Sequence, residues 1–401
     1  MKPQLPVIQG IVEKGFEPVR EEFARNFSGR GELGAACAVF RQGRKVVDLW
    51  GGTRDDKTGA PWERETMTPV FSSTKGFAAM TLAVANARGW LDYDEKVAAY
   101  WPQFAQNGKQ DITVRTLMGH RAGLCALDGL TIREFADLDT SAQAGALAKK
   151  KPLWLPGTRQ GYHCWTIGWY TGELLRRVDP EHRSLGRFFR EEIAGPLGAD
   201  FFIGLPPEIP ADRLATLHGG LNSIPELFAH IGEMDGRLLF QFLNPRSLTW
   251  RSMIDRQQLV KHDNFNRREL QSVEMPAGNG IGSARGMALA FPVFATGGRK
   301  LGLAPEFRAD LEKPVTLPPG ETIDRVARMD FRFSLGFVKP SPDLPFGSNS
   351  RSFGIGGAGG SLAFADPEKA IGYAYVMNHM GYSVSGDPRE RALRDAVYRC
   401  V

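Results

Sequence analysis

The stretch VFSSTKGFAAM, residues 70–80, places a serine three residues ahead of a lysine, where a helix is expected to begin. Residues three apart share one face of a helix, so Ser72 and Lys75 can meet. A lysine buried beside the apolar residues 77–80 has a lowered pKa and can take the proton of a serine hydroxyl. The alternative is a serine that caps the helix and a lysine that reaches water. This stretch alone does not favour either interpretation, the catalytic pair or the helix cap.

The flanking sequence predicts one antiparallel sheet formed by both ends of the chain. Helices are expected at residues 17–28 and 388–400, and a long, mostly helical segment lies in the middle. Strand-like runs with turn signals lie at 31–40, 44–52, 331–340, 359–365 and 370–378. This predicts an α/β fold of the α+β kind, with an inserted helical domain. Residues 1–75 with 295–401 would form the sheet domain and 76–294 the helical domain, with the active site between them.

Composition excludes several classes of function. The chain has 401 residues and a formal net charge of +5, from 50 basic and 45 acidic residues, which predicts no nucleic-acid partner. No run is apolar for long enough to predict a membrane span, and the first residues do not resemble a signal peptide. Four widely spaced cysteines without a C-x-x-C pair argue against a zinc site and a disulfide framework. We therefore expect a cytoplasmic protein without a metal or another cofactor.

Two further stretches carry residues suited to catalysis. In LPGTRQGYHCW, residues 155–165, Tyr162 precedes a predicted helix, and a phenol beside a lysine could hold a lowered pKa and move a proton. The alternative is a half-buried tyrosine that packs against Trp165. In FGIGGAGGSLAFADPE, residues 353–368, glycines ahead of a strand permit close approach of a substrate or another backbone. The run also satisfies G-x-G-x-x-G, but a strand follows it instead of a helix, so no dinucleotide site is predicted.

Five stretches in order resemble one known superfamily. They are GELGAACAVFRQGRKVVDLWGG, PVFSSTKGFAA, ITVRTLMGHRAGL, PGTRQGYHCWTIGW and GIGGAGGSLAFADPE. Together they resemble the serine β-lactamase and penicillin-binding-protein superfamily, and within it the class C-like branch with the family VIII carboxylesterases. The resemblance covers nearly the whole chain.

The resemblance implies roles for particular residues. Ser72 matches the acylated nucleophile, Lys75 its helix partner, and Tyr162 the tyrosine that shares proton transfer. The N–H of Ala358 would join that of Ser72 in an oxyanion hole. His120 matches a structural histidine. A Ser–His pair built on His120 or on the histidine after Tyr162 stays an alternative.

Two departures from the family pattern bear on specificity. The lactamase Tyr-x-Asn is here Tyr-His-Cys, with His163 and Cys164 after the tyrosine. The lactamase Lys-Thr-Gly is here Ile355, Gly356 and Gly357, so a polar group is missing at the strand edge. We expect His163 and these three residues to contact substrate. An isoleucine there would disfavour the carboxylate of a β-lactam.

The resemblance implies a serine hydrolase that cleaves carboxylic esters of small or short-chain acyl groups through an acyl-enzyme. Its partner would be a small-molecule ester, and no oligomeric state is predicted. A β-lactamase or D-Ala-D-Ala peptidase-like amide hydrolase and a transacylase are alternatives. An inactive scaffold of the same fold is an alternative of another class.

Overall fold

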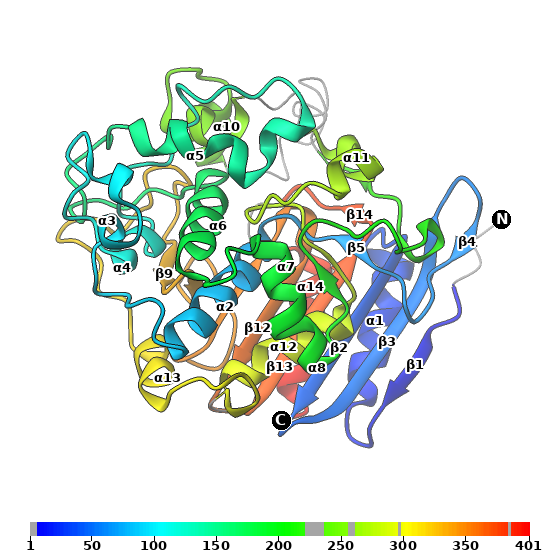
Figure 1. The fold of residues 1–401 in the computed structure, drawn as a ribbon. Coiled ribbons are helices and arrows are strands. Elements are labelled where there is room, and N and C mark those ends of the chain that lie inside the picture. The colour runs from blue at the N-terminus through cyan, green and yellow to red at the C-terminus, as the bar shows by residue number, and fades with distance from the viewer. Residues whose placement is uncertain (1–5, 221–235, 256–260, 296–297, 384–385) are drawn as a thin grey trace.

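The two ends of the chain meet in one antiparallel sheet (Figure 1). This computed structural model describes residues 6–220, 236–255, 261–295, 298–383 and 386–401. Strands pair in the order β1-β3-β2-β13-β12-β11-β10-β9, with β4 beside β3. Their bounds are Gln9–Val12 (β1), Gly34–Arg41 (β2), Arg44–Asp55 (β3), Ala60–Pro61 (β4), Arg332–Ser334 (β9), Phe337–Lys339 (β10), Phe353–Gly356 (β11), Leu362–Asp366 (β12) and Ile371–Met377 (β13). The sheet predicted from both ends is thereby confirmed.

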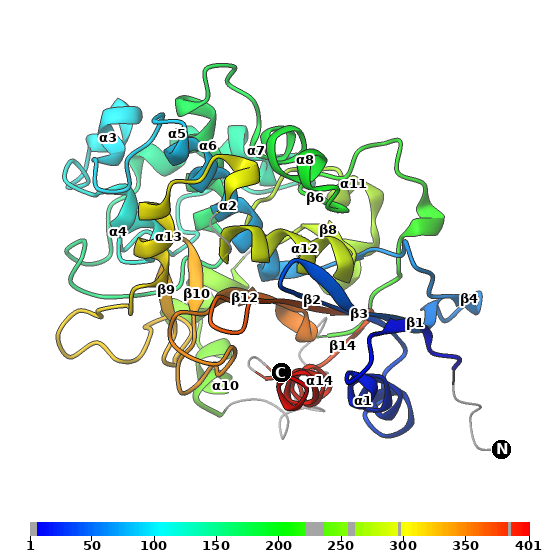
Figure 2. The ribbon, with the colours of Figure 1, turned by 90° about the horizontal axis from the view of Figure 1, so that it is seen from below.

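Helices cover both faces of this sheet (Figure 2). On one face lie α1 (Glu17–Gly29) and α14 (Pro388–Arg399), which pack against each other. On the other lie α12 (Ala284–Ala295) and, beyond it toward the helical part, α2 (Thr74–Ala87). Because both faces are covered, every residue of β13 is buried, as in a strand that reads as a continuous apolar run.

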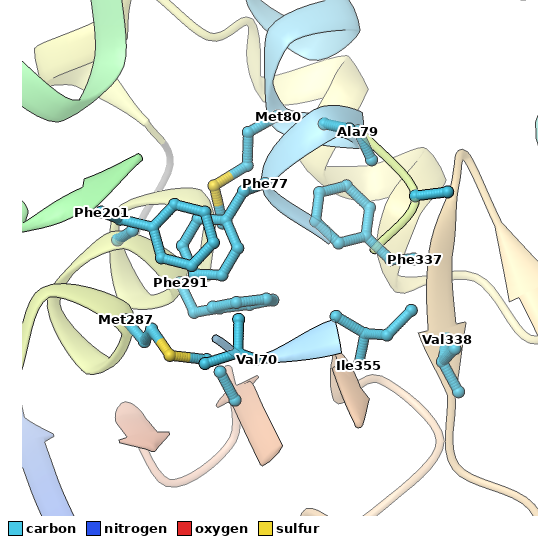
Figure 3. Close-up of a cluster of buried hydrophobic side chains, with 14 of the residues drawn as sticks. Val70, Phe77, Ala79, Met80, Phe201, Met287, Phe291, Phe337, Val338 and Ile355 are labelled. Atoms are coloured by element: carbon cyan, nitrogen blue, oxygen red, sulfur yellow. The ribbon is translucent and has the colours of Figure 1, made fainter. Parts of the chain in front are cut away.

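The first three turns of α2 are enclosed, and this decides the environment of the serine–lysine pair. All residues from Thr74 to Ala85 are buried. Phe77 stacks on Phe201 with ring centroids 3.7 Å apart, within an apolar cluster shared with β11 (Figure 3). At Gly76, a Cβ would lie 2.7 Å from Ile355 Cγ2, so the glycine lets the helix approach β11 closely. The helix thus places its lysine in the protein interior.

The segment between the two parts of the sheet is mostly helical, as predicted. Its helices are short: Val97–Tyr100 (α3), Val114–Met118 (α4), Thr140–Lys149 (α5), Thr166–Val178 (α6), Leu185–Phe189 (α7), Gly195–Leu197 (α8), Gly236–Phe242 (α10), Arg268–Gln271 (α11) and Pro305–Glu312 (α13). Two small sheets join it to the rest of the fold, formed by Thr68–Pro69 (β5), Ile281–Gly282 (β8) and Phe201–Phe202 (β6), and by His218–Gly219 (β7) and His379–Met380 (β14).

Some element boundaries differ from the prediction. The run 331–340 is split into β9 and β10 because Gly336, with φ of +91°, makes the turn between them. The strand expected at 359–365 begins only at Leu362, since Gly359 and Gly360 have positive φ. The glycine run itself starts as a strand, β11, as the resemblance implied by placing Ile355 at a strand edge. The two-domain division stays a prediction, and α12, from the segment assigned to the helical domain, packs on the sheet.

Across the described part of the chain, no helix combines the length and the apolar character needed to span a bilayer.

Candidate active site

Ser72 lies in a tight turn that links β5 to α2. The turn is a single 3-10 segment, Phe71–Ser73, and the α-helix begins at the next residue. Phe71 has a φ of +47°, in the left-handed region that a bulky side chain seldom adopts. Such strain is held by surrounding structure and is common where a reactive group must be presented. The turn presents Ser72 to a cavity while its neighbour Ser73 is buried.

Lys75 reaches back from α2 to the serine. Its Nζ lies 3.0 Å from Ser72 Oγ and donates to the carbonyl oxygen of Ala277 at 2.6 Å. The residue is only 5% exposed, and burial lowers the pKa of its ammonium to about 8. Among described residues, no carboxylate forms an ion pair with it. Lys75 can therefore lose its proton near neutral pH, as a base for a serine requires.

Tyr162 approaches the same serine from the loop just before α6. Its hydroxyl donates to Ser72 Oγ at 2.9 Å, and its ring lies 5.0 Å from Lys75 Nζ. The backbone N–H of Tyr162 donates to the buried carboxylate of Asp324 at 3.0 Å, which fixes the approach. Burial raises the pKa of the phenol well above its usual value. The lowered phenol pKa expected from the sequence is therefore wrong: Tyr162 keeps its proton, and Lys75 is the group poised to be neutral.

The glycine run brings Ala358 to the other side of the serine. Ala358 opens a short 3-10 turn after β11 and lines the same cavity as Ser72. A Cβ on Gly357 would lie 2.1 Å from the carbonyl oxygen of Val70, so only glycine permits this approach to the serine turn. The structure thus places the N–H groups of Ser72 and Ala358 on two backbone segments that touch.

Two buried hydroxyl groups hold these segments together. Ser361 Oγ donates to the carbonyl oxygen of Val70 at 3.0 Å and lies 3.2 Å from Ser73 Oγ. Ser73 Oγ also lies 3.3 Å from the carbonyl oxygen of Ile355. Ser73 follows Ser72, and Ser361 follows the glycine turn. The contact between their hydroxyl groups therefore sets the distance between the serine turn and the glycine turn. The sequence gives no indication of this pair or of the buried Asp324, because a lone serine or aspartate carries no local signal of its partner.

Two predicted substrate contacts are not in the cavity wall. The side chain of Ile355 is 1% exposed and packs into the cluster beneath α2 (Figure 3). His163 is fully buried, with Nε2 accepting from the N–H of Leu124 at 3.0 Å and Nδ1 lying 2.7 Å from the carbonyl oxygen of Gly161. The expectation that Ile355 and His163 contact the substrate is therefore wrong, because both side chains are buried and pack in the protein interior.

The histidines do not form a Ser–His pair. His120 Nδ1 accepts a hydrogen bond from the N–H of His163 at 2.9 Å, and burial lowers the pKa of both rings, that of His163 to about 4. The hydrogen bonds of Ser72 Oγ go to Lys75 and Tyr162 instead. His120 thus holds the backbone directly after Tyr162, in line with its predicted structural role.

A cavity of about 700 Å³ opens at Ser72. Its wall includes Gly356, Gly357 and Cys164, and a large apolar set: Phe71, Trp165, Leu238, Phe242, Leu243, Trp250, Met253, Ile254, Met329, Phe331, Val338, Leu344, Pro345, Phe346, Leu362 and Met380. A concave, mostly apolar cavity with a few polar groups at one point is typical of a small-molecule site.

Comparison with known proteins gives one consistent result. The family described as Beta-lactamase matches residues 21–398. The esterase/β-lactamase LipL of Mycobacterium tuberculosis is 33% identical over 377 residues, which cover 92% of this chain and 83% of that protein. A crystal structure of a family VIII carboxylesterase superposes with a TM-score of 0.84 at 34% identity, covering 98% of this chain and all of the other. A penicillin-binding-protein homologue from Caulobacter crescentus superposes with a TM-score of 0.83 at 33% identity over the same shares.

Proposed function

The chain belongs to the Beta-lactamase family, and we propose that it cleaves carboxylic esters, including those of small or short-chain acyl groups, through a covalent acyl-enzyme on Ser72. The observation that carries this proposal is the contact of one hydroxyl with two proton-transfer groups. Ser72 Oγ lies 3.0 Å from Lys75 Nζ and 2.9 Å from the Tyr162 hydroxyl, in the wall of a mostly apolar cavity.

In the proposed acylation, neutral Lys75 accepts the proton of Ser72 while Oγ forms a bond to the ester carbonyl carbon. The carbonyl electron pair moves onto oxygen, where the N–H groups of Ser72 and Ala358 would donate. The carbon–oxygen bond to the alcohol then breaks. The Tyr162 phenol, which burial keeps protonated, gives its proton to the leaving oxygen and regains one from the Lys75 ammonium.

Deacylation would reverse the roles around a water molecule. Lys75, neutral again, draws the proton from water as its oxygen attacks the acyl carbon, and Ser72 Oγ leaves with a proton from the same pair. An alcohol or amine acceptor in place of water would make the protein a transacylase.

The four cysteines are all free thiols, which supports the proposed cytoplasmic location.

Esters are favoured over β-lactams by the cavity wall. A lactam carboxylate needs a cation or donors beside the reacting carbonyl, and most of the wall is apolar, including Phe71 and Trp165, although Lys261 and His262 also line it. A neutral ester meets no such cost. The name of the relative LipL includes both activities, so β-lactam hydrolysis is the second candidate.

The test combines labelling with a substrate panel. A fluorophosphonate should add its mass to the peptide containing Ser72, and Ser72→Ala should abolish both the label and the hydrolysis of p-nitrophenyl acetate. Ser283→Ala, at another buried serine, serves as the matched control and should keep the label. A label that survives Ser72→Ala contradicts the acyl-enzyme, and the absence of any label on the wild type supports an inactive scaffold. Equal efficiency on a chromogenic cephalosporin and the ester contradicts the preference for esters.

A further inference from the structure

The cavity extends beyond the reacting serine to the opposite side of the sheet. Near Ser72 its wall includes Trp165 from the helical part. At its far end the wall includes Leu362 of β12 and Arg394 of α14. Helix α14 covers the face of the sheet opposite to α2 (Figure 2). Gly356 at the end of β11 and Leu362 at the start of β12 also line the cavity, which therefore passes this end of the two strands. Its volume of about 700 Å³ is within the range that encloses drug-sized ligands and exceeds what a short ester fills.

The far wall is apolar and comes from separate parts of the chain. Leu238 and Phe242 of α10, Leu243 just after it, Phe346 and Leu362 contribute to it. Leu243 is 43% exposed, so its apolar surface contacts water when the cavity is empty. Covering such surface with an apolar ligand removes it from water and is favourable.

The charged groups at the α14 end already have partners. Arg394 Nε lies 2.9 Å from Glu390 Oε1, and Arg389 Nη2 lies 2.7 Å from Asp387 Oδ2. A charged tail would have to compete with these ion pairs, whereas an uncharged one would not. Lys261 also lines the cavity, but its side chain is exposed to solvent.

We propose that this far part of the cavity, formed by Leu238, Phe242, Leu243, Phe346 and Leu362, binds the extended apolar chain of the ester. The inference rests on the proposed function and specifies its substrate class: short esters react, and uncharged esters with a long apolar chain bind better. The chain would lie along the apolar wall while the carbonyl stays at the serine.

The test is a series of p-nitrophenyl esters from acetate to octanoate, kept below the concentrations at which they aggregate. Complete burial of one methylene corresponds to about a fourfold gain, so even partial burial of six should raise kcat/KM by about tenfold or more. The gain should appear mainly as a lower KM. An ester of the same length whose chain ends in a carboxylate should not show this gain in kcat/KM.

A matched pair of variants separates the wall from the rest of the surface. Leu243→Glu places a charge in the wall, and Phe240→Glu places the same charge on α10, where the side chain is 74% exposed and not part of the wall. Leu243→Glu should lower the octanoate-to-acetate ratio of kcat/KM about tenfold, the size of the gain itself. Phe240→Glu should keep the wild-type ratio. Leu243→Gln gives a milder version if the charged variant does not fold.

The outcomes distinguish the two proposals. Acetate hydrolysis that needs Ser72, together with a flat or falling ratio along the series, would overturn the chain-binding site and leave the ester hydrolase intact. A ratio that falls equally in both glutamate variants would also overturn it. Hydrolysis that survives Ser72→Ala would contradict the proposed function itself.

Discussion

Replacement of Lys75 by methionine should remove activity. At neutral pH it should also remove the free-energy cost of holding a buried ammonium in the folded state. Burial lowers the pKa of Lys75 from 10.5 to about 8, because the interior disfavours the ammonium. The unfolded chain therefore binds this proton more tightly than the folded chain does. Methionine has a similar shape and carries no proton, so it isolates this effect. Near neutral pH, activity and stability should therefore change in opposite directions at this position.

The sign and size follow from the two pKa values. Below about pH 8 both states carry the ammonium, and the folded state bears the whole cost, about 3 kcal/mol. Between about pH 8 and 10.5 the folded state has released the proton and the unfolded state has not, so the cost falls as pH rises. The advantage of Lys75→Met over the wild type should thus be about 2 kcal/mol larger near pH 7 than near pH 9.5. The lost hydrogen bonds to Ser72 and Ala277 cost about 1–3 kcal/mol at either pH, and they cancel in this difference.

The assay is urea unfolding of both proteins at the two pH values, with fluorescence and circular dichroism as separate probes. Lys109→Met is a suitable comparison, because burial also lowers the pKa of Lys109 to about 8 while its Nζ donates to the carbonyl oxygens of Gln106 and Ala148. That variant should keep its activity and show a pH effect in the same direction, but a smaller one, because the Lys109 ammonium also donates to the carbonyl oxygen of Lys150. If the advantage of Lys75→Met is the same at both pH values, Lys75 is not a neutral amine in the folded enzyme, and the proposed base is wrong.

Four further results are expected. With a Lys75 pKa of about 8, kcat/KM for esters should rise about tenfold from pH 7 to 9, and a flat profile would contradict Lys75 as the base. Tyr162→Phe should lower kcat by about 10²-fold, and a wild-type kcat would remove the phenol from the mechanism. Ser361→Ala should lower kcat about tenfold with little change in KM, whereas a change in KM alone would mean that Ser361 does not position the oxyanion donors. Ile355→Lys should lower the Tm without creating cephalosporin hydrolysis, and a gain of that activity would restore Ile355 as a ligand contact.

The fold and the three central residues could be predicted because they leave local signals. Strand alternation, hairpin turns and five ordered motifs lie in short stretches, so Ser72, Lys75 and Tyr162 were found before their contacts were known. The same signals predict one antiparallel sheet formed by both ends of the chain, but the order of its strands comes from the structure. Periodicity could not show that Gly336 divides one apolar run into two strands, because a single positive φ decides it.

What the sequence did not reveal depends on burial and on long-range partners. The phenol of Tyr162 was expected to have a lowered pKa beside a lysine, yet burial dominates and raises it. His163 was assigned to substrate because it follows Tyr162, but its ring points into the interior and bonds to the loop at Leu124. Side-chain direction after a turn is set by backbone geometry that a motif does not record. The extent of the cavity depends on α10, which lies far from the motifs in sequence.

Ile355 shows how a residue inside a motif can influence the site through packing alone. Its methyl groups occupy the space left by Gly76 on α2, and its carbonyl oxygen lies 3.3 Å from Ser73 Oγ. Both contacts tie β11 to the serine turn, so the distance between the backbone N–H groups of Ser72 and Ala358 depends on how this residue packs. A longer or charged side chain would have to displace α2, and with it Ser72. Ile355 therefore offers no direct contact that could exclude a carboxylate, and the proposed preference for neutral esters rests on the mostly apolar cavity wall, in which Lys261 and Arg394 are cationic exceptions.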